Sequence, residues 1–158
     1  MACDLALAYD PARHQCDLVY DGSDFVLDST PATPMLMALL CRRRAQPADT
    51  VPDASPGAPD APAQLLARGG WPGDALDAQG RLTGSRLWLL GAAKATETTR
   101  RLAEDYAAEG LEQIEADRGY TIALTVGWAP QALPGGRMLL IEAVAGATSV
   151  AVTRALGG

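Results

Sequence analysis

Residues 68–90 contain the two most distinctive motifs of the chain, Arg68-Gly69-Gly70-Trp71-Pro72-Gly73-Asp74 and, after a short polar link, Gly84-Ser85-Arg86-Leu87-Trp88-Leu89-Leu90. Two of the three tryptophans lie here, each close to an arginine and to glycines. Glycine lets the backbone turn tightly or approach another chain, and tryptophan beside arginine offers apolar area together with stacking. The stretch contains no nucleophile in a standard catalytic motif, no paired acids and no metal-ligand set. It is therefore predicted to be a folding and docking element, with Trp88 buried among leucines against the helix that follows.

That helix gives the strongest periodic signal in the sequence. Thr96 is a plausible N-cap with Glu97 in the first turn, and the run 117–119 ends the helix at a glycine. Apolar or small residues recur along one side: Leu102, Ala103, Tyr106, Ala107, Gly110, Leu111 and Ile114. Such a stripe is typical of a helix packed on a core, and Gly110 within it indicates a close approach by another segment.

The C-terminal third predicts an antiparallel meander packed on the long helix. Apolar residues alternate with small or polar ones over residues 120–128, which is the pattern of a half-buried strand. Pro134-Gly135-Gly136 supplies a turn, residues 138–144 return as a second strand, Gly146 allows another turn, and residues 149–153 add a third strand. Residues 85–90 are expected to form a short helix or a buried turn.

The N-terminal region predicts a hairpin of residues 3–9 and 14–20 around the turn at 10–13. Strand alternation places Tyr9 opposite His14, with the pairs Leu7 and Cys16, Leu5 and Leu18, and Cys3 and Tyr20 on the same face. Residues 25–27 suggest a short strand. A helix then follows, capped by Thr33 with Pro34 at its first position and with Arg42, Arg43 and Arg44 in its last turn.

Residues 46–63 form a low-complexity segment with five prolines and no periodicity, which predicts an extended, mobile surface loop or an arm laid on a partner. Neither side of this loop has a complete core by itself. The chain of 158 residues is therefore predicted to be one α+β domain, residues 1–158. It consists of an antiparallel sheet packed on a long amphipathic helix, with a shorter N-terminal helix and this Pro-rich loop.

Composition restricts the classes of function. The net charge of −6 argues against non-specific binding to nucleic acid or anionic membrane. The apolar runs are too short to span a bilayer, and the N-terminus lacks the pattern of a signal peptide, so we expect folding in a cytoplasm. Three cysteines without a Cys-x-x-Cys pair argue against a disulfide framework and a structural zinc site. Cys3, His14 and Cys16 suggest a metal, but they are one ligand short, and we expect neither a metal nor a cofactor.

The order of the motifs resembles a known family. The Arg-Gly-Gly-Trp-Pro-Gly-Asp loop, the Gly-Ser-Arg-Leu-Trp motif, the long helix and the strand ending in Trp128 are similar to those of the small wedge protein of Mu-like phage baseplates. That family looks like a short-chain relative of the sheath initiator of contractile tails, sometimes labelled lysozyme-like. The likeness covers residues from about 3 to 145. The chain departs from the family at Trp71-Pro72, where two adjacent aromatics are usual, and in its longer linker.

The resemblance implies a structural baseplate protein of a contractile phage tail or tailocin. By this likeness, about six copies surround the tail tube, join the other wedge proteins and the tube or hub, and start the first sheath ring. The chain would then belong to the virion after assembly in the host cytoplasm. A helix in the sheath-initiator families ends in an arginine motif that locks the fold or a neighbour. Arg43 or Arg44 matches that motif best, although its usual glutamate is missing.

Eleven residues are candidates for interface or fold-locking roles, and none is a candidate for catalysis: Arg43, Arg44, Arg68, Trp71, Gly73, Asp74, Ser85, Arg86, Trp88, Val150 and Val152. At least one of Arg68 and Arg86 is expected to pair with Asp74 or with backbone carbonyls. The last two residues lie in an uncharged strand, 149–153, which predicts an unguarded sheet edge open to a partner strand. Alternatively, that strand is internal to the sheet or frays as a terminus.

Two other functions compete with the baseplate role. The lysozyme-like label of the relatives suggests glycoside hydrolysis, which needs two carboxyl groups held across a bond, but Asp74 and Glu142 occur singly. Ser85 does not lie in a Gly-x-Ser-x-Gly elbow, and the single histidine is not placed near it. We therefore expect no enzyme activity. A free-standing adaptor domain of a host cell is the second alternative, and co-sedimentation with tail particles would exclude it.

Overall fold

The computed structural model describes residues 3–52, 68–130 and 137–157 and confirms an α+β fold. Its main sheet has the order β5-β6-β7, with strands β5 (Ile122–Trp128), β6 (Met138–Ala145) and β7 (Thr148–Ala155). Both pairings are antiparallel, so the predicted meander is confirmed. Gly146 adopts a positive φ of 61° in the turn between β6 and β7, a conformation that glycine adopts without steric cost.

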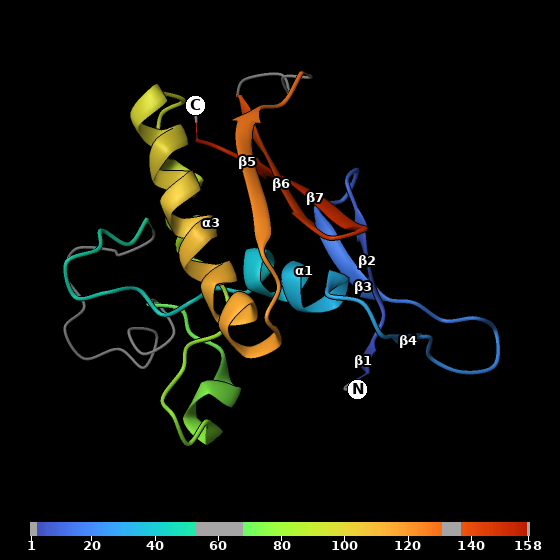
Figure 1. Cartoon of the computed structure of the whole chain (residues 1–158). Coiled ribbons are helices and arrows are strands. Elements are labelled where there is room, and N and C mark those ends of the chain that lie inside the picture. The colour runs from blue at the N-terminus through green and yellow to red at the C-terminus, as the bar shows by residue number, and fades with distance from the viewer. Residues whose placement is uncertain (1–2, 53–67, 131–136, 158) are drawn as a thin grey trace.

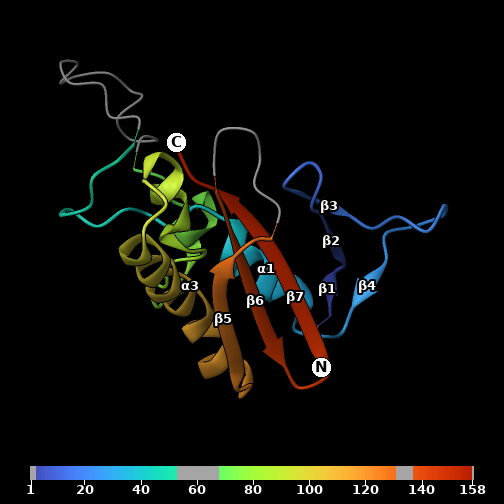
Figure 2. The ribbon, with the colours of Figure 1, turned by 90° about the horizontal axis from the view of Figure 1, so that it is seen from above.

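One face of this sheet is buried in the hydrophobic core. The central strand β6 contributes Leu139, Ile141, Ala143 and Ala145, which are at most 2% exposed. Helices α1 (Ala32–Leu40) and α3 (Glu97–Arg118) pack together and against the sheet. Strands β1 to β4 lie beyond β7 (Figures 1 and 2), and Asp4 of β1 pairs with Arg118 at the end of α3 at 2.9 Å.

Helix α3 is built as the sequence predicts. The Thr96 side chain accepts a hydrogen bond from the Thr99 amide, Glu97 lies in the first turn, and Gly119 ends the helix with φ 68°. The apolar stripe is buried except at its first member, because Leu102 is 37% exposed. Including Leu102 was therefore wrong: it lies beside the stripe that Ala103 begins. A Cβ added at Gly110 would lie 2.9 Å from the Ala38 carbonyl oxygen, which confirms the close approach.

The prediction for the first helix is wrong at both ends. Helix α1 begins at Ala32, so Thr33 is not its cap and Pro34 is not its first residue. The buried Thr33 hydroxyl instead accepts a hydrogen bond from the Leu7 amide and donates one to the Leu5 carbonyl, both at 3.1 Å. A carboxylate oxygen of Asp28 accepts the Thr33 amide at 3.1 Å. The helix ends at Leu40, so the three arginines lie beyond its last turn.

The N-terminal strands differ from the single hairpin that was predicted. Strand β1 (Asp4–Leu5) pairs with β4 (Leu27–Asp28), while β2 (Leu7–Asp10) pairs with β3 (Gln15–Leu18). Tyr9 lies opposite Cys16, and Leu7 lies opposite Leu18, so the predicted register is wrong by two residues. The turn is displaced because the Asp10 carboxylate accepts the amides of Ala12 and Arg13, and His14 takes a left-handed φ of 53°.

Parts of two predicted loops lie outside the described residues. The turn at Pro134-Gly135-Gly136 and most of the segment 46–63 belong to the ranges 131–136 and 53–67, which the structure does not describe. Residues 46–52 are described, and Asp49 within them is held by an ion pair with Arg86 at 3.0 Å. This first part of the segment therefore contacts the domain through Asp49. Within the described ranges, no helix has the length and apolar character needed to cross a membrane.

Candidate functional site

The arginine run that follows α1 connects the two glycine motifs. The Arg43 amide donates to the Ser85 carbonyl at 3.0 Å, and the Ser85 amide donates to the Cys41 carbonyl at 3.1 Å. On the same short segment, the Ala45 amide donates to the Arg68 carbonyl at 2.7 Å, and the Gly70 amide donates to the Arg42 carbonyl at 2.9 Å. Residues 41–45 are thus extended backbone between two loops that are separate in sequence.

Glycine is required where these segments meet. Gly84 has φ 95°, and a Cβ there would lie 2.3 Å from the Cys41 carbonyl oxygen. Gly69 has φ 66°, and a Cβ there would lie 2.9 Å from the indole ring of Trp88. Both positions combine a left-handed backbone with a close neighbour, so any side chain would be strained and would collide.

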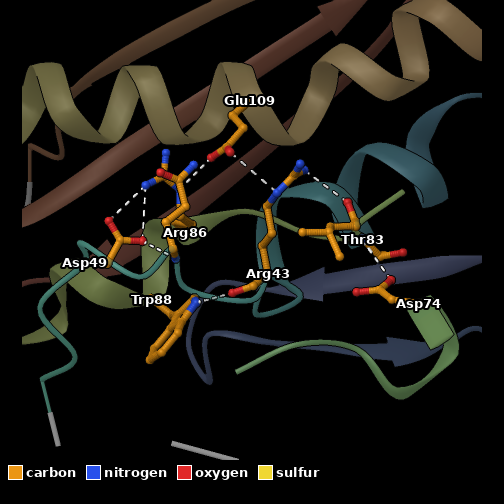
Figure 3. A network of polar contacts seen from close by, with 9 residues as sticks. Arg43, Asp49, Asp74, Thr83, Arg86, Trp88 and Glu109 are labelled. Atoms are coloured by element: carbon orange, nitrogen blue, oxygen red, sulfur yellow. Dashed lines mark hydrogen bonds and ion pairs between the residues drawn. The ribbon is translucent and has the colours of Figure 1, made fainter. Parts of the chain in front are cut away.

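Arg86 is the centre of a half-buried ion-pair network (Figure 3). Its Nε donates to Glu109 on α3 at 2.7 Å, and its Nη1 donates to both carboxylate oxygens of Asp49 at 3.0 and 3.2 Å. The guanidinium also lies over the Tyr106 ring, 4.3 Å from its centroid. Burial opposes the charge on Arg86, but the hydrogen bonds to Glu109 and Asp49 outweigh burial and raise the pKa of this group.

Arg43 joins the same network through the second oxygen of Glu109, at 3.5 Å from its Nε (Figure 3). Its Nη1 donates to the Leu82 carbonyl at 3.0 Å. The Glu109 carboxylate therefore pairs with two guanidinium groups, Arg43 from residues 41–45 and Arg86 from the second glycine motif. The carboxylate that pairs with Arg43 therefore comes from the long helix and not from the neighbouring sequence.

Trp88 is buried, as predicted, at 8% exposure in helix η2 (Arg86–Ala92). Its surroundings differ from the prediction, since the indole points away from α3 in Figure 3. The indole N–H donates to the Arg43 carbonyl at 2.8 Å, and the ring edge lies against Gly69. Trp88 therefore fastens the two motifs to each other, while its leucine neighbours fill the core.

Beyond its backbone bonds to residues 42 and 45, the first motif is held by contacts of its side chains. Asp74, in helix η1 (Pro72–Leu76), accepts the Thr83 amide at 2.9 Å and joins the start of the link to its end. Arg68 donates to the Gln46 carbonyl, which agrees with the expectation that Arg68 or Arg86 would pair with Asp74 or a carbonyl. The Trp71 ring lies over Gly73, where a Cβ would come within 1.9 Å of it, and remains 45% exposed.

The other candidates are distributed over the domain. The side chain of Arg44 is exposed. Ser85 is 1% exposed, and its hydroxyl donates to the Leu39 carbonyl at 3.0 Å, so it is held as a structural group. Val150 and Val152 lie in β7 with their side chains in the core, 7% and 2% exposed. Of the eleven candidates, Arg43, Arg86 and Trp88 form one site with Asp74 beside it.

Three members of this site were missed in the sequence. Glu109 lies outside the predicted apolar stripe, Asp49 belongs to the predicted loop, and Tyr106 is predicted only as a member of the stripe. The position of Glu109 next to Gly110, where another segment comes close, is the one signal that favours a buried role for it. Asp49 carries no such signal, because its partner Arg86 lies 37 residues further along the chain, in the second motif.

The chemistry of the network is structural. Both oxygens of Glu109 and both oxygens of Asp49 face guanidinium groups at 2.7 to 3.5 Å, which is the geometry of ion pairing. Among residues 3–52, 68–130 and 137–157, no three His, Cys, Asp or Glu side chains gather as a metal site requires. What the network does is hold residues 41–49, both glycine motifs and α3 in one arrangement.

Fold and site together define a small α+β domain in which a half-buried ion-pair network holds the loops in place, and the sequence comparisons identify its family. The sequence model described as Phage protein GP46 matches residues 31–154, and the chain belongs to this family. It is also 38% identical over 112 residues to "Baseplate protein gp46" of Escherichia phage Mu, an alignment that covers 71% of this chain and 68% of that protein. No solved structure matches the chain.

Proposed function

We propose that this chain is a structural protein of the baseplate of a contractile phage tail or tailocin. The support is its membership of the GP46 family and its similarity to a baseplate protein of phage Mu. Within the baseplate it acts as a wedge protein on which the first sheath ring starts. It joins the other wedge proteins to the tube or hub, in about six copies, as the resemblance of its motifs implies.

The outer edge of β7 is the observation that favours a role in starting the sheath. The Leu156 amide donates to the Arg137 carbonyl on the β6 side. Every second residue of an antiparallel strand bonds to the same neighbour. The N–H and C=O groups of Val150 and Val152, which lie an even number of positions before Leu156, therefore point toward β6. The alternate residues Ser149 and Ala151 therefore turn their N–H and C=O groups outward. Within the described residues no hydrogen bond reaches these groups, and the strand has no charge before Arg154.

This edge is short and has a defined end. The Tyr9 hydroxyl accepts the Thr153 amide at 3.1 Å and lies 3.2 Å from the Thr153 carbonyl, which accepts from it. A partner strand can therefore pair along Ser149 and Ala151 but meets Tyr9 at the next outward position. Main-chain bonds over this short edge supply affinity, and side-chain pockets supply specificity.

The opposite edge of the sheet is better guarded. Glu115 of α3 accepts the outward amide of Ile122 at 2.7 Å, and Arg100 of α3 donates to the outward carbonyl of Val126 at 2.9 Å. Side chains of the long helix thus occupy groups of β5 that a partner strand would need. The contrast between the two edges favours β7 as the pairing strand.

The experiment replaces Ala151 by proline in a phage or tailocin that depends on this chain. Proline removes one outward N–H and leaves the β6–β7 ladder intact, which an edge position tolerates. The expected variant has an unchanged melting temperature and enters the baseplate, but its tails carry a tube without a sheath. Ala151→Val, which keeps the N–H, is the matched control and should assemble normally.

Each result decides a different part of the proposal. Normal sheaths on tails that carry a folded Ala151→Pro protein would show that β7 does not start the sheath. Absence of the wild-type chain from purified tails, measured by mass spectrometry, would overturn the baseplate role itself.

A further inference from the structure

A cavity of about 320 Å³ lies between the end of α1, η2 and the strands β6 and β7, and its lining includes Trp88 but not Arg86, Glu109 or Asp49. Its lining is mainly apolar, from Leu39, Leu40, Leu87, Trp88, Ile141 and Val152, and it also includes His14, Cys41 and Arg154. This volume is near the lower limit of about 300–1,000 Å³ that is usual for ligand pockets. It fits one side chain of a partner better than a large cofactor.

Arg154 is the unusual member of this lining. It extends from β7 on the core face of the sheet, and its Nη2 donates to the Trp88 carbonyl at 3.2 Å. Its Nε is buried without a hydrogen-bond partner among the described residues. A buried guanidinium nitrogen in this state costs free energy.

The surroundings of Arg154 add positive charge. Arg42 lies over the Trp88 ring, 5.5 Å from its centroid. Burial, followed by the charge of Arg42, lowers the pKa of Arg154. Neither arginine forms an ion pair within the described residues, whereas Arg43 and Arg86 share Glu109. In a chain of net charge −6, two neighbouring arginines with no acidic partner in the described part of the chain create a local positive potential that attracts an anion.

We propose that this cavity binds an aspartate or glutamate side chain of a neighbouring protein in the assembled particle, with the carboxylate on Arg154. The proposal rests on the proposed baseplate role. A carboxylate matches the planar fork of the guanidinium, and the apolar lining accepts the methylene stem of the acid. Thr153 and Ala155 of β7 also line the cavity, which therefore lies next to the position where Tyr9 ends the free outer edge of this strand.

The first test compares stability with assembly in Arg154→Met. Methionine keeps an unbranched chain of similar length and removes the charge. The isolated protein should melt at the same or a higher temperature, because an uncompensated buried charge is gone. Its copy number in purified tails should fall at least about tenfold, since one partner of a buried charge pair is removed. Arg137→Met is the matched control: Arg137 lies over the Trp128 ring, 5.7 Å from its centroid, outside the cavity.

The second test measures carboxylate binding directly on the wild-type chain. Protein with ¹⁵N-labelled arginine is titrated with the capped peptide acetyl-Ala-Glu-Ala-amide, its glutamine analogue, and inorganic phosphate. The glutamate peptide should shift the Nε–H resonance of Arg154, assigned by comparison with Arg154→Lys, and the glutamine peptide should not. This measurement needs neither a folded Arg154→Met protein nor a tail particle.

The outcomes separate this proposal from the baseplate role. Normal incorporation of Arg154→Met into tails that contain the wild-type chain would overturn the cavity proposal alone. A missing response to the glutamate peptide, or an equal response to the glutamine peptide, would overturn it as well. A response to phosphate at lower concentration than to the peptide would identify a free-anion site instead. If the wild-type chain is absent from tails, the baseplate role fails, and the peptide titration still decides whether the cavity binds carboxylate.

Discussion

Trp88 illustrates at the residue scale how one side chain holds two loops. We expect Trp88→Ala to lower the free energy of unfolding by about 3–5 kcal/mol, the range for large truncations in a core. The loss combines the buried ring, the hydrogen bond to the Arg43 carbonyl and the contact with Gly69. Urea unfolding followed by far-UV circular dichroism measures it.

Trp71→Ala is the matched control for this prediction. The Trp71 ring is 45% exposed and lies over Gly73 at the surface, so its truncation should cost far less. Equal losses for the two tryptophans would show that the Trp88 contacts contribute nothing beyond an exposed ring.

Gly110 provides a test in which two physical effects have opposite signs. Helix propensity alone makes Gly110→Ala stabilising by about 1 kcal/mol. The added Cβ, however, would lie 2.9 Å from the Ala38 carbonyl oxygen and 3.1 Å from both the Gly84 carbonyl oxygen and the Ser85 Cβ. Overpacking of this kind costs about 1–3 kcal/mol, so we expect a lower melting temperature.

The exposed neighbour Ala108 supplies the reference for propensity. Ala108→Gly should destabilise by the propensity difference alone. A rise in melting temperature for Gly110→Ala would mean that α3 can move away from the Gly84-Ser85 backbone, and the close approach would then be unimportant for stability.

At the scale of elements, Arg81 connects the link between the motifs to the end of α3. Its Nε and Nη2 donate to one oxygen of Asp77 at 2.9 and 2.8 Å, and its Nη1 donates to Asp117 at 2.7 Å. Hydrogen bonds from the Arg81 side chain, and next from the Gln79 amide, lower the pKa of Asp77 to about 2. Because the pKa of Asp77 is lower in the folded state, its contribution to stability is fully present above the unfolded value of 3.8.

This contribution must disappear as the pH falls through about 2. The wild-type chain should therefore be more stable than Asp77→Asn above about pH 4, and the difference should vanish near pH 2. Urea unfolding across this range measures the difference, with Arg81→Gln and the double variant completing a cycle. A difference that stays constant with pH would show that ionisation of Asp77 does not contribute to folding.

Elements whose apolar pattern repeats over many residues were predictable from the sequence. Elements whose position depends on contacts between distant segments were not. Helix α3 and the β5–β6–β7 meander follow from repeats of apolar residues over many positions. The β2–β3 register was missed because a shift of two residues keeps Leu7, Tyr9, Cys16 and Leu18 on one face, so alternation cannot distinguish the two registers. The start of α1 was missed because Thr33 bonds to the break between β1 and β2, a partner that no local pattern reveals.

The candidate site was predictable in part for the same reason. The glycine and tryptophan motifs indicated where segments meet, and Arg43, Arg86 and Trp88 do lie together there. The acids that complete the network come from a helix face and a Pro-rich segment that local sequence assigns to solvent. Arg154 was missed because its burial depends on the packing of β7 against η2.

At the scale of the whole molecule, the Pro-rich segment has two parts with different expected behaviour. Its composition predicts cleavage by proteinase K within residues 53–63 before any other site, since unpacked loops are cut first. Residues 46–52 should resist, because Asp49 is paired with Arg86. Mass spectrometry of the first fragments locates the cut, and Asp49→Asn should extend cleavage into residues 46–52. Early cleavage there in the wild-type chain would contradict the docking of this part.

The network also predicts how the chain unfolds as a whole. Glu109 joins α3 to residues on both sides of the Pro-rich segment, Arg43 before it and Arg86 after it. Helix α1 contacts α3, η2, β2 and β7, so loosening one part removes packing from the others. We therefore expect one cooperative transition for residues 1–158, with coincident urea curves from near-UV and far-UV circular dichroism. Glu109→Gln should lower the midpoint and keep the curves coincident, whereas separate transitions in the wild-type chain would show two independently folding units.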